Sequence, residues 1–125
     1  MARFALVRGW IECEFESTPA MRARAAAWAA RGAEYGLAPD QARLYARGWV
    51  FPEAPLNYVS LVFYGADVRS AALGFVRAMV GDVAGVEEDA SGLLFVDADD
   101  GQEQLVWHVA GSDVSEEARP PQPIG

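Results

Sequence analysis

The chain is 125 residues long, 52% hydrophobic, and carries a formal net charge of −8. This length and apolar content fit one compact domain with one core, and the negative charge argues against nucleic acid as a direct ligand, because phosphate backbones are bound by cationic surfaces. A single cysteine, Cys13, excludes an internal disulfide, and no apolar run approaches the roughly 20 residues that span a bilayer, so we expect a cytoplasmic protein that does not enter a membrane.

Residues 3–16 predict a long first strand. Apolar and polar side chains alternate along it, with Ile11 on the apolar face and Arg8, Trp10 and Glu12 on the other. One face of this strand should therefore pack on the core, and the other should contact water.

The next elements are a helix, a loop and a second strand. Ser17-Thr18-Pro19 is typical of a helix start, and the apolar stripe that follows predicts a helix to about residue 34. Turn-forming residues at 35–41 predict a loop. The period of two returns over 44–51, which predicts a strand, and the prolines within 52–55 predict the turn that ends it.

Residues 56–81 change from a period of two to about 3.6, which predicts a strand that runs directly into a helix. The strand face expected to pack on the core holds Val59, Leu61 and Phe63. The opposite face, expected to stay open, holds Tyr58, Ser60, Val62 and Tyr64. Gly65 and Asp67 are typical of a turn and a helix cap, and Gly81 is typical of a helix end.

The last third predicts a hairpin and a tail. Residues 92–97 and 104–109 have strand character, and Asp99-Asp100-Gly101 between them is typical of a tight turn. Residues 111–125 are acidic and proline-rich without periodicity, which predicts a flexible tail. We therefore expect one domain over residues 1–110, followed by this tail.

The order of predicted elements indicates an α+β fold. Two strand-helix-strand units with both helices on one face of a mainly antiparallel sheet form the ferredoxin-like βαββαβ plan, a two-layer sandwich, here with an extra C-terminal hairpin strand.

The predicted open sheet face combines aromatic and charged side chains. Such side chains supply much of the binding energy at protein interfaces, and a basic partner would be attracted by the negative charge. Alternatively, these aromatic side chains pack on one another, on the tail or on a second copy in a homodimer. The candidate binding surface consists of Arg8, Trp10, Glu12, Arg47, Trp49, Tyr58 and Tyr64.

A small enzyme or ligand-binding protein that acts as a dimer is the alternative function. Glu12 and Glu14 lie close enough on one strand for a general acid and base, although solubilising charges explain them as well. A pocket lined by Arg47, Asn57 and Tyr64 would support this alternative.

Metal and nucleophile sites are not indicated. The acidic run from Asp97 to Glu103 places its glycine and glutamate wrongly for a calcium loop, and His108 with Cys13 gives too few zinc ligands. Cys13 is in phase with the apolar face of its strand, which favours a buried thiol over a nucleophile. The sequence therefore predicts no catalytic residue, no metal and no cofactor.

Three segments carry a family resemblance. RGWIEC at 8–13, FYGADVR at 63–69 and LFVDADDG at 94–101 resemble blocks of small standalone bacterial proteins, some of which resemble immunity proteins of polymorphic toxin systems. The resemblance implies a cytosolic inhibitor that binds a cognate toxin through an acidic, aromatic-containing surface. The clustered aromatic side chains and the net charge of −8 make a non-enzymatic protein-binding module the leading hypothesis.

Overall fold

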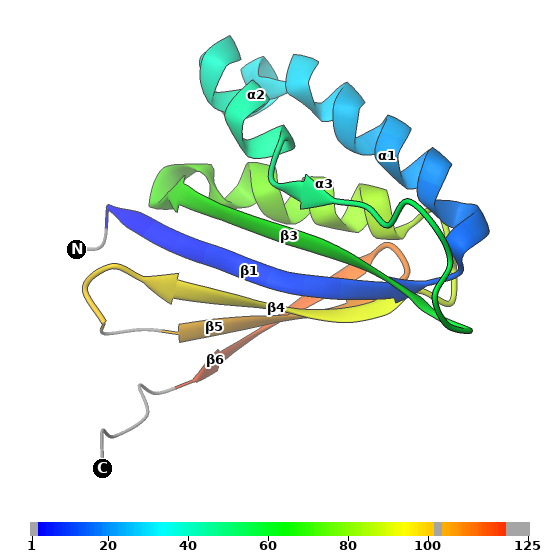
Figure 1. Ribbon diagram of the computed structural model, residues 1–125. Helices are drawn as coiled ribbons and strands as arrows, with labels where there is room; N and C mark the ends of the chain where they lie inside the picture. Colours follow the sequence, from blue (N-terminus) through cyan, green and yellow to red (C-terminus); the bar gives the residue numbers. More distant parts are fainter. Residues whose placement is uncertain (1–2, 102–103, 120–125) are drawn as a thin grey trace.

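The protein has an α+β fold. The computed structural model describes residues 3–101 and 104–119, which form three α-helices and one six-stranded antiparallel sheet (Figure 1). The strands are β1 (Phe4–Cys13), β2 (Trp49–Val50), β3 (Ser60–Arg69), β4 (Ser91–Ala98), β5 (Gln104–Ala110) and β6 (Asp113–Arg119). The α-helices are α1 (Thr18–Ala27), α2 (Pro39–Ala46) and α3 (Leu73–Ala84). The strand order is β2-β3-β1-β4-β5-β6.

All three helices lie on one side of the sheet (Figure 1). On the covered face, α3 buries Phe75, Val76 and Met79 completely. We call the opposite side of the sheet, which no helix covers, the open face. A sheet covered on one side only must separate its apolar and polar residues by the alternation along each strand.

The structure confirms the predicted buried face of the first strand. Val7, Ile11 and Cys13 are buried, and β1 lies between β3 and β4 in the middle of the sheet. Gly9 allows β4 to approach closely, because a Cβ atom there would lie 2.1 Å from the carbonyl oxygen of Leu93. The predicted strand over 3–16 is too long, since a 3-10 turn begins at Phe15.

The predicted faces of the third strand are wrong. Val62 and Tyr64 are buried under the helices, whereas Leu61 is 39% exposed and Phe63 is 47% exposed. The reason is that β3 continues to Arg69 instead of turning at residue 65. In this longer strand, buried Val68 is in phase with Val62 and Tyr64.

Two further boundaries around this strand also differ from the prediction. Asp67 lies within β3 and does not cap a helix. Gly81 lies inside α3, which ends at Ala84. A side chain at position 81 would approach Ser112 to 3.0 Å, so this glycine serves close packing of α3 against the turn before β6.

The predicted loop at 35–41 is confirmed only at residues 36–38, and α2 and a two-residue β2 replace its end and the predicted strand at 44–51. Pro39 occupies the first turn of α2, where no N–H is needed. The backbone N–H of Ala38 donates to Oε1 of Gln41 at 3.1 Å, which stabilises the helix start. Ala42 and Tyr45, three positions apart, are the buried residues of the helix.

The predicted first helix is also divided. The buried positions Met21, Ala25 and Trp28 follow the expected stripe, but α1 ends at Ala27 and 3-10 turns continue the chain to Tyr35.

The C-terminal segment forms a strand where a flexible tail was predicted. β6 pairs with β5 from Asp113 to Arg119, so the sheet continues beyond residue 110, and only residues 120–125 of the predicted tail lie outside the described residues. Trp107 donates its indole N–H to Glu116 at 2.9 Å, and His108 contacts Glu117 at 2.9 Å. Glu116 and Glu117 therefore pair with side chains of β5, and the exposed charged residues of β6 form a charged sheet edge.

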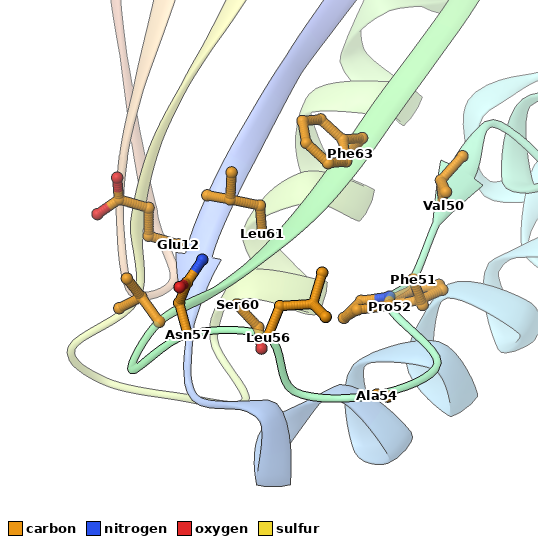
Figure 2. Close-up of a pocket in the computed structure, with 11 residues that line it drawn as sticks. Glu12, Val50, Phe51, Pro52, Ala54, Leu56, Asn57, Ser60, Leu61 and Phe63 are labelled. Atoms are coloured by element: carbon orange, nitrogen blue, oxygen red, sulfur yellow. The ribbon is translucent and has the colours of Figure 1, made fainter.

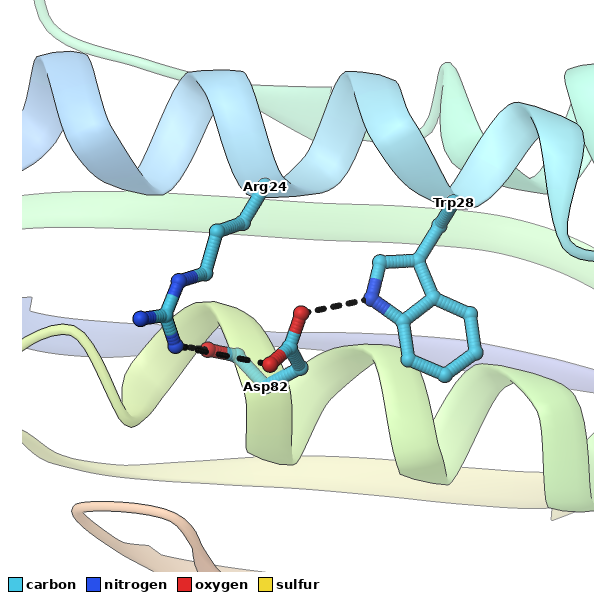
Figure 3. A network of polar contacts seen from close by, with 3 residues as sticks. All are labelled: Arg24, Trp28 and Asp82. Atoms are coloured by element: carbon cyan, nitrogen blue, oxygen red, sulfur yellow. Dashed lines mark hydrogen bonds and ion pairs between the residues drawn. The ribbon is translucent and has the colours of Figure 1, made fainter.

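A polar network joins α3 to the end of α1 and to the 3-10 turn that follows it (Figure 3). The indole N–H of Trp28, which is 2% exposed, donates to the Asp82 carboxylate at 2.8 Å. Arg24 contacts the carbonyl oxygen of Asp82 at 3.1 Å and its carboxylate at 3.4 Å. Asp82 therefore satisfies a buried donor and also holds an exposed arginine.

The Trp28 hydrogen bond should contribute more stability than the Arg24 ion pair. We expect Asp82→Ala to cost about 1–3 kcal/mol, because it leaves the buried indole N–H without an acceptor. Arg24→Ala should cost less than about 1 kcal/mol, because exposed ion pairs are weak. Urea denaturation of both variants, with Asp82→Asn as a control that keeps an acceptor, measures the difference. Equal losses for Asp82→Ala and Arg24→Ala would contradict this assignment.

Candidate functional site

A groove of about 360 Å³ lies at one corner of the open face (Figure 2). It is enclosed by the end of β2, the connection 51–59 and the start of β3. Its walls are mainly apolar and include Val50, Phe51, Pro52, Leu56, Leu61 and Phe63. We call it the sheet groove.

The sequence of the connection explains why the groove is open. Pro52 and Pro55 cannot donate ladder hydrogen bonds, and β2 pairs with β3 only at Trp49 and Val50. The chain therefore leaves β3 after Val50 and returns to it at Ser60. The space between the two segments is lined by side chains and is not closed by a strand.

Large apolar side chains are concentrated around this groove. Leu56 is 89% exposed, Tyr58 is 104% exposed and Val50 is 61% exposed. In the register of the sheet, Val50 lies opposite Phe63, and Phe63 lies opposite Trp10. Contiguous exposed apolar surface of this kind marks interaction sites on soluble proteins.

Three polar residues also line the sheet groove. Glu12 projects from β1 opposite Leu61, Asn57 belongs to the connection, and Ser60 begins β3. Within the described part of the chain, the Glu12 carboxylate makes no hydrogen bond or ion pair. The groove therefore offers an apolar surface with one unpaired negative charge.

Three of the predicted surface residues lie together on the open face. Arg8 forms an ion pair with Asp97 at 3.1 Å and lies over the ring of Phe95 at 5.5 Å. Trp10 packs against the same ring, with 6.3 Å between ring centroids. Together with Glu12, they extend the open face from the sheet groove across β1 towards β4, with Trp10 as the apolar residue between the two charged side chains.

Trp49 and Tyr64 do not belong to this surface, contrary to the prediction. Trp49 is 9% exposed and donates its indole N–H to the sulfur of Met79 at 3.4 Å. Tyr64 is 3% exposed and donates to the carbonyl oxygen of Tyr45 at 2.8 Å. Burial raises the pKa of Tyr64, and the nearby Tyr45 adds to this effect. Both rings are part of the core under the helices.

The remaining two predicted residues are separated from each other. Tyr58 is fully exposed on the connection 51–59, whereas Arg47 follows α2 and lines a different groove on the helical side. Arg47, Asn57 and Tyr64 therefore do not line one pocket, so the pocket expected for the alternative function is not formed by these residues.

Sequence reasoning missed the apolar residues that line the sheet groove. The local alternation predicts Leu61 and Phe63 in the core. The alternation along the whole strand contained the missing signal, because Leu61 and Phe63 lie on the same strand face as Gly65, Asp67 and Arg69. A face that carries an aspartate and an arginine favours solvent.

Glu14 and Asp97, two of the residues considered for acid, base or metal chemistry, have other contacts. Glu14 follows the end of β1, and its backbone N–H donates to Glu87 at 2.9 Å, so Glu12 and Glu14 do not share a strand face. Asp97 accepts a hydrogen bond from Gln104 at 2.6 Å, and Gly101 makes the predicted turn with a φ of +69°. Among residues 3–101 and 104–119, no three His, Cys, Asp or Glu side chains are grouped to hold a metal ion.

Cys13 is a buried thiol, 2% exposed, at the end of β1. Burial, with a smaller effect of Glu87, raises its pKa to about 11. The thiolate is the nucleophilic form, so this environment suppresses its reactivity.

Iodoacetamide should modify native Cys13 at pH 8 at least about a hundredfold more slowly than the urea-unfolded chain, because both the raised pKa and burial reduce access to thiolate. The raised pKa also means that the unfolded chain loses this proton first. The contribution of the Cys13 thiol to the free energy of unfolding is therefore complete below about pH 9 and declines as the pH approaches about 11. Mass spectrometry follows alkylation, and equal rates in the two states would contradict the burial of Cys13.

Comparisons with protein-family models, curated proteins and solved structures found no match to this chain. In the part of the chain that the structure describes, no helix combines the length and apolar character needed to cross a membrane.

Proposed function

We propose that this chain is a non-enzymatic protein-binding module that engages another protein through its open face. The observation that carries this proposal is the concentration of exposed Val50, Leu56, Leu61 and Phe63 around one groove. Leaving these side chains in water is unfavourable, by roughly 25 cal/mol per Å² of apolar surface. A partner that covers them gains this free energy on binding.

The arrangement has the anatomy of a binding interface. Phe63 and Trp10 lie opposite each other on neighbouring strands, and aromatic side chains of this kind dominate binding energy when a partner excludes water from them. Arg8 and Glu12 flank Trp10 on the same face. The sheet groove provides a concave site for an apolar side chain of the partner.

Electrostatics supports a basic partner. The chain carries a net charge of −8, and the unpaired Glu12 carboxylate lines the sheet groove. A positively charged surface would be attracted over a distance and would find an ion-pair partner at the interface. The form of this function that we favour is an inhibitor of a cognate toxin, which the sequence resemblance implies, with a basic binding surface on the toxin, which the charge of this chain favours.

A cytoplasmic location is part of the same proposal. It is supported by the one cysteine, which is free and buried, as expected in a reducing compartment.

The ferredoxin-like plan is also a proposal for this chain. It is supported by the neighbours of β1, which are β3 and β4, and by β2 beside β3. β5, β6 and α2 would then be additions to a βαββαβ unit.

A small-molecule site is the second candidate function. The volume of the sheet groove, about 360 Å³, is within the range of roughly 300–1,000 Å³ for small-ligand sites. The combination of apolar walls with Glu12 favours a ligand with an apolar body and a cationic group. Such a ligand would occupy the same surface as a protein partner.

The double variant Leu61→Asp/Phe63→Asp tests the protein-binding proposal. It should weaken binding to the partner at least about thirtyfold, as expected when hot-spot contacts are lost. Partners are captured by cross-linking from lysate of the source organism, and affinity is then measured by calorimetry with the purified partner.

The matched control is Leu44→Asp on α2, because Leu44 is 59% exposed and lies outside the sheet groove. Both variants should retain cooperative unfolding and the Leu44 variant should retain the affinity. Undiminished binding by the Leu61/Phe63 variant would exclude the open face as the interface. Light scattering of the isolated chain distinguishes this proposal from the homodimer alternative, because the proposal predicts the mass of a monomer.

A further inference from the structure

We propose that a second groove, on the helical side of the molecule, binds a small organic anion. This groove has a volume of about 400 Å³ and is lined by Arg22 of α1, Arg43 of α2 and Arg47, with four alanines, Trp49 and Phe51. We call it the arginine groove. It does not depend on the function proposed for the open face, with which it shares only the wall residue Phe51.

The charge distribution is the first argument. The chain has 18 acidic and 10 basic residues, yet three arginines and no carboxylate line this groove. Several arginines elsewhere are paired with carboxylates, such as Arg8 with Asp97 and Arg24 with Asp82. Positive charge thus collects at one site of an acidic protein.

The pairing of these arginines is the second argument. Within the described ranges, Arg22 and Arg47 form no ion pair with a carboxylate. Arg43 contacts Asp40 three residues earlier, whose side chain is 91% exposed, and such surface pairs are weak and easily exchanged. All three guanidinium groups are therefore available to an oxyanion.

The walls of the groove define the rest of the ligand. The ring of Phe51 stacks on Trp49, with 6.0 Å between centroids and 20° between planes, and the Arg22 guanidinium lies 5.1 Å from the Phe51 ring. The four alanines in the lining contribute only methyl groups to the walls. A carboxylate or phosphate on a compact apolar body matches both the arginines and the apolar walls of the groove. Guanidinium binds planar and tetrahedral oxyanions through paired hydrogen bonds, and the apolar body contacts the aromatic rings.

A compact anion fits this site better than a polyanion. The net charge of −8 repels a long phosphate backbone, whereas a small molecule interacts mainly with the local charge of the groove. The volume is also within the range of roughly 300–1,000 Å³ for small-ligand sites.

The experiment is an NMR titration of the ¹⁵N-labelled full chain with phenylphosphate, benzoate, benzylamine and inorganic phosphate. Phenylphosphate or benzoate should produce saturable shifts of the Trp49 indole N–H signal, which Trp49→Phe identifies. Benzylamine, which has the same ring but the opposite charge, should not. Inorganic phosphate should bind at least about tenfold more weakly than phenylphosphate if the apolar walls contribute.

The double variant Arg22→Gln/Arg47→Gln should weaken the affinity for the anion by about tenfold or more. Arg69→Gln is the matched control, since Arg69 lies outside the groove and stacks over Phe4 at 5.8 Å, and it should leave the affinity unchanged. The amide spectrum of each variant reports whether the fold is intact. The proposal is overturned if neither anion gives saturable shifts up to about 10 mM, if benzylamine binds equally well, or if Arg69→Gln weakens binding as much as the double variant.

Discussion

Coverage of the sheet on one side by α1, α2 and α3 is the constraint on which the rest of this structure depends (Figure 1). It requires each strand to place one set of alternate residues in the core and the other set in solvent. Val7 and Ile11 of β1, with Val62 and Val68 of β3, fill the covered side and are at most 1% exposed. Trp10 and Phe63 are thereby left on the open face, where they lie opposite each other.

The two edges of the sheet are protected differently, and this difference locates the candidate interface. β6 carries exposed charged residues, which discourage pairing with another chain. β2 pairs with only two residues of β3, and the proline-containing connection that follows it leaves the apolar sheet groove. The molecule therefore presents an accessible apolar surface at the β2–β3 edge, beside the unpaired Glu12.

The sequence predicted those elements whose two faces differ clearly in polarity. β1 alternates apolar residues with Arg8 and Glu12, so its buried face could be assigned, and the β4–β5 hairpin was marked by its turn residues. Near Phe63 and Tyr64, β3 is apolar on both faces. Its buried face is determined by residues beyond Gly65 and by the carbonyl oxygen of Tyr45, which is distant in sequence and accepts the hydrogen bond of the buried Tyr64 hydroxyl.

The other failures have the same origin in tertiary contacts. Residues 44–51 alternate as a strand would, but burial of Ala42 and Tyr45 against neighbouring helical turns stabilises α2. The acidic segment before Arg119 has no core pattern of its own and becomes a strand because β5 supplies its backbone partners. Of the candidate surface, Arg8, Trp10 and Glu12 lie on the open face because β1 has the predicted buried face. Trp49 and Tyr64 are buried because the strands predicted around them differ in the structure.

Hydroxyl-radical footprinting of the adjacent residues Phe63 and Tyr64 tests the central claim most directly, because the two rings lie on opposite sides of one strand. Relative to the urea-unfolded chain, we predict that Phe63, at 47% exposure, keeps much of its reactivity, while Tyr64, at 3%, is strongly protected. Protection of Phe63 together with reactive Tyr64 in the isolated chain would place the apolar surface of β3 in the core and would contradict the account of the open face.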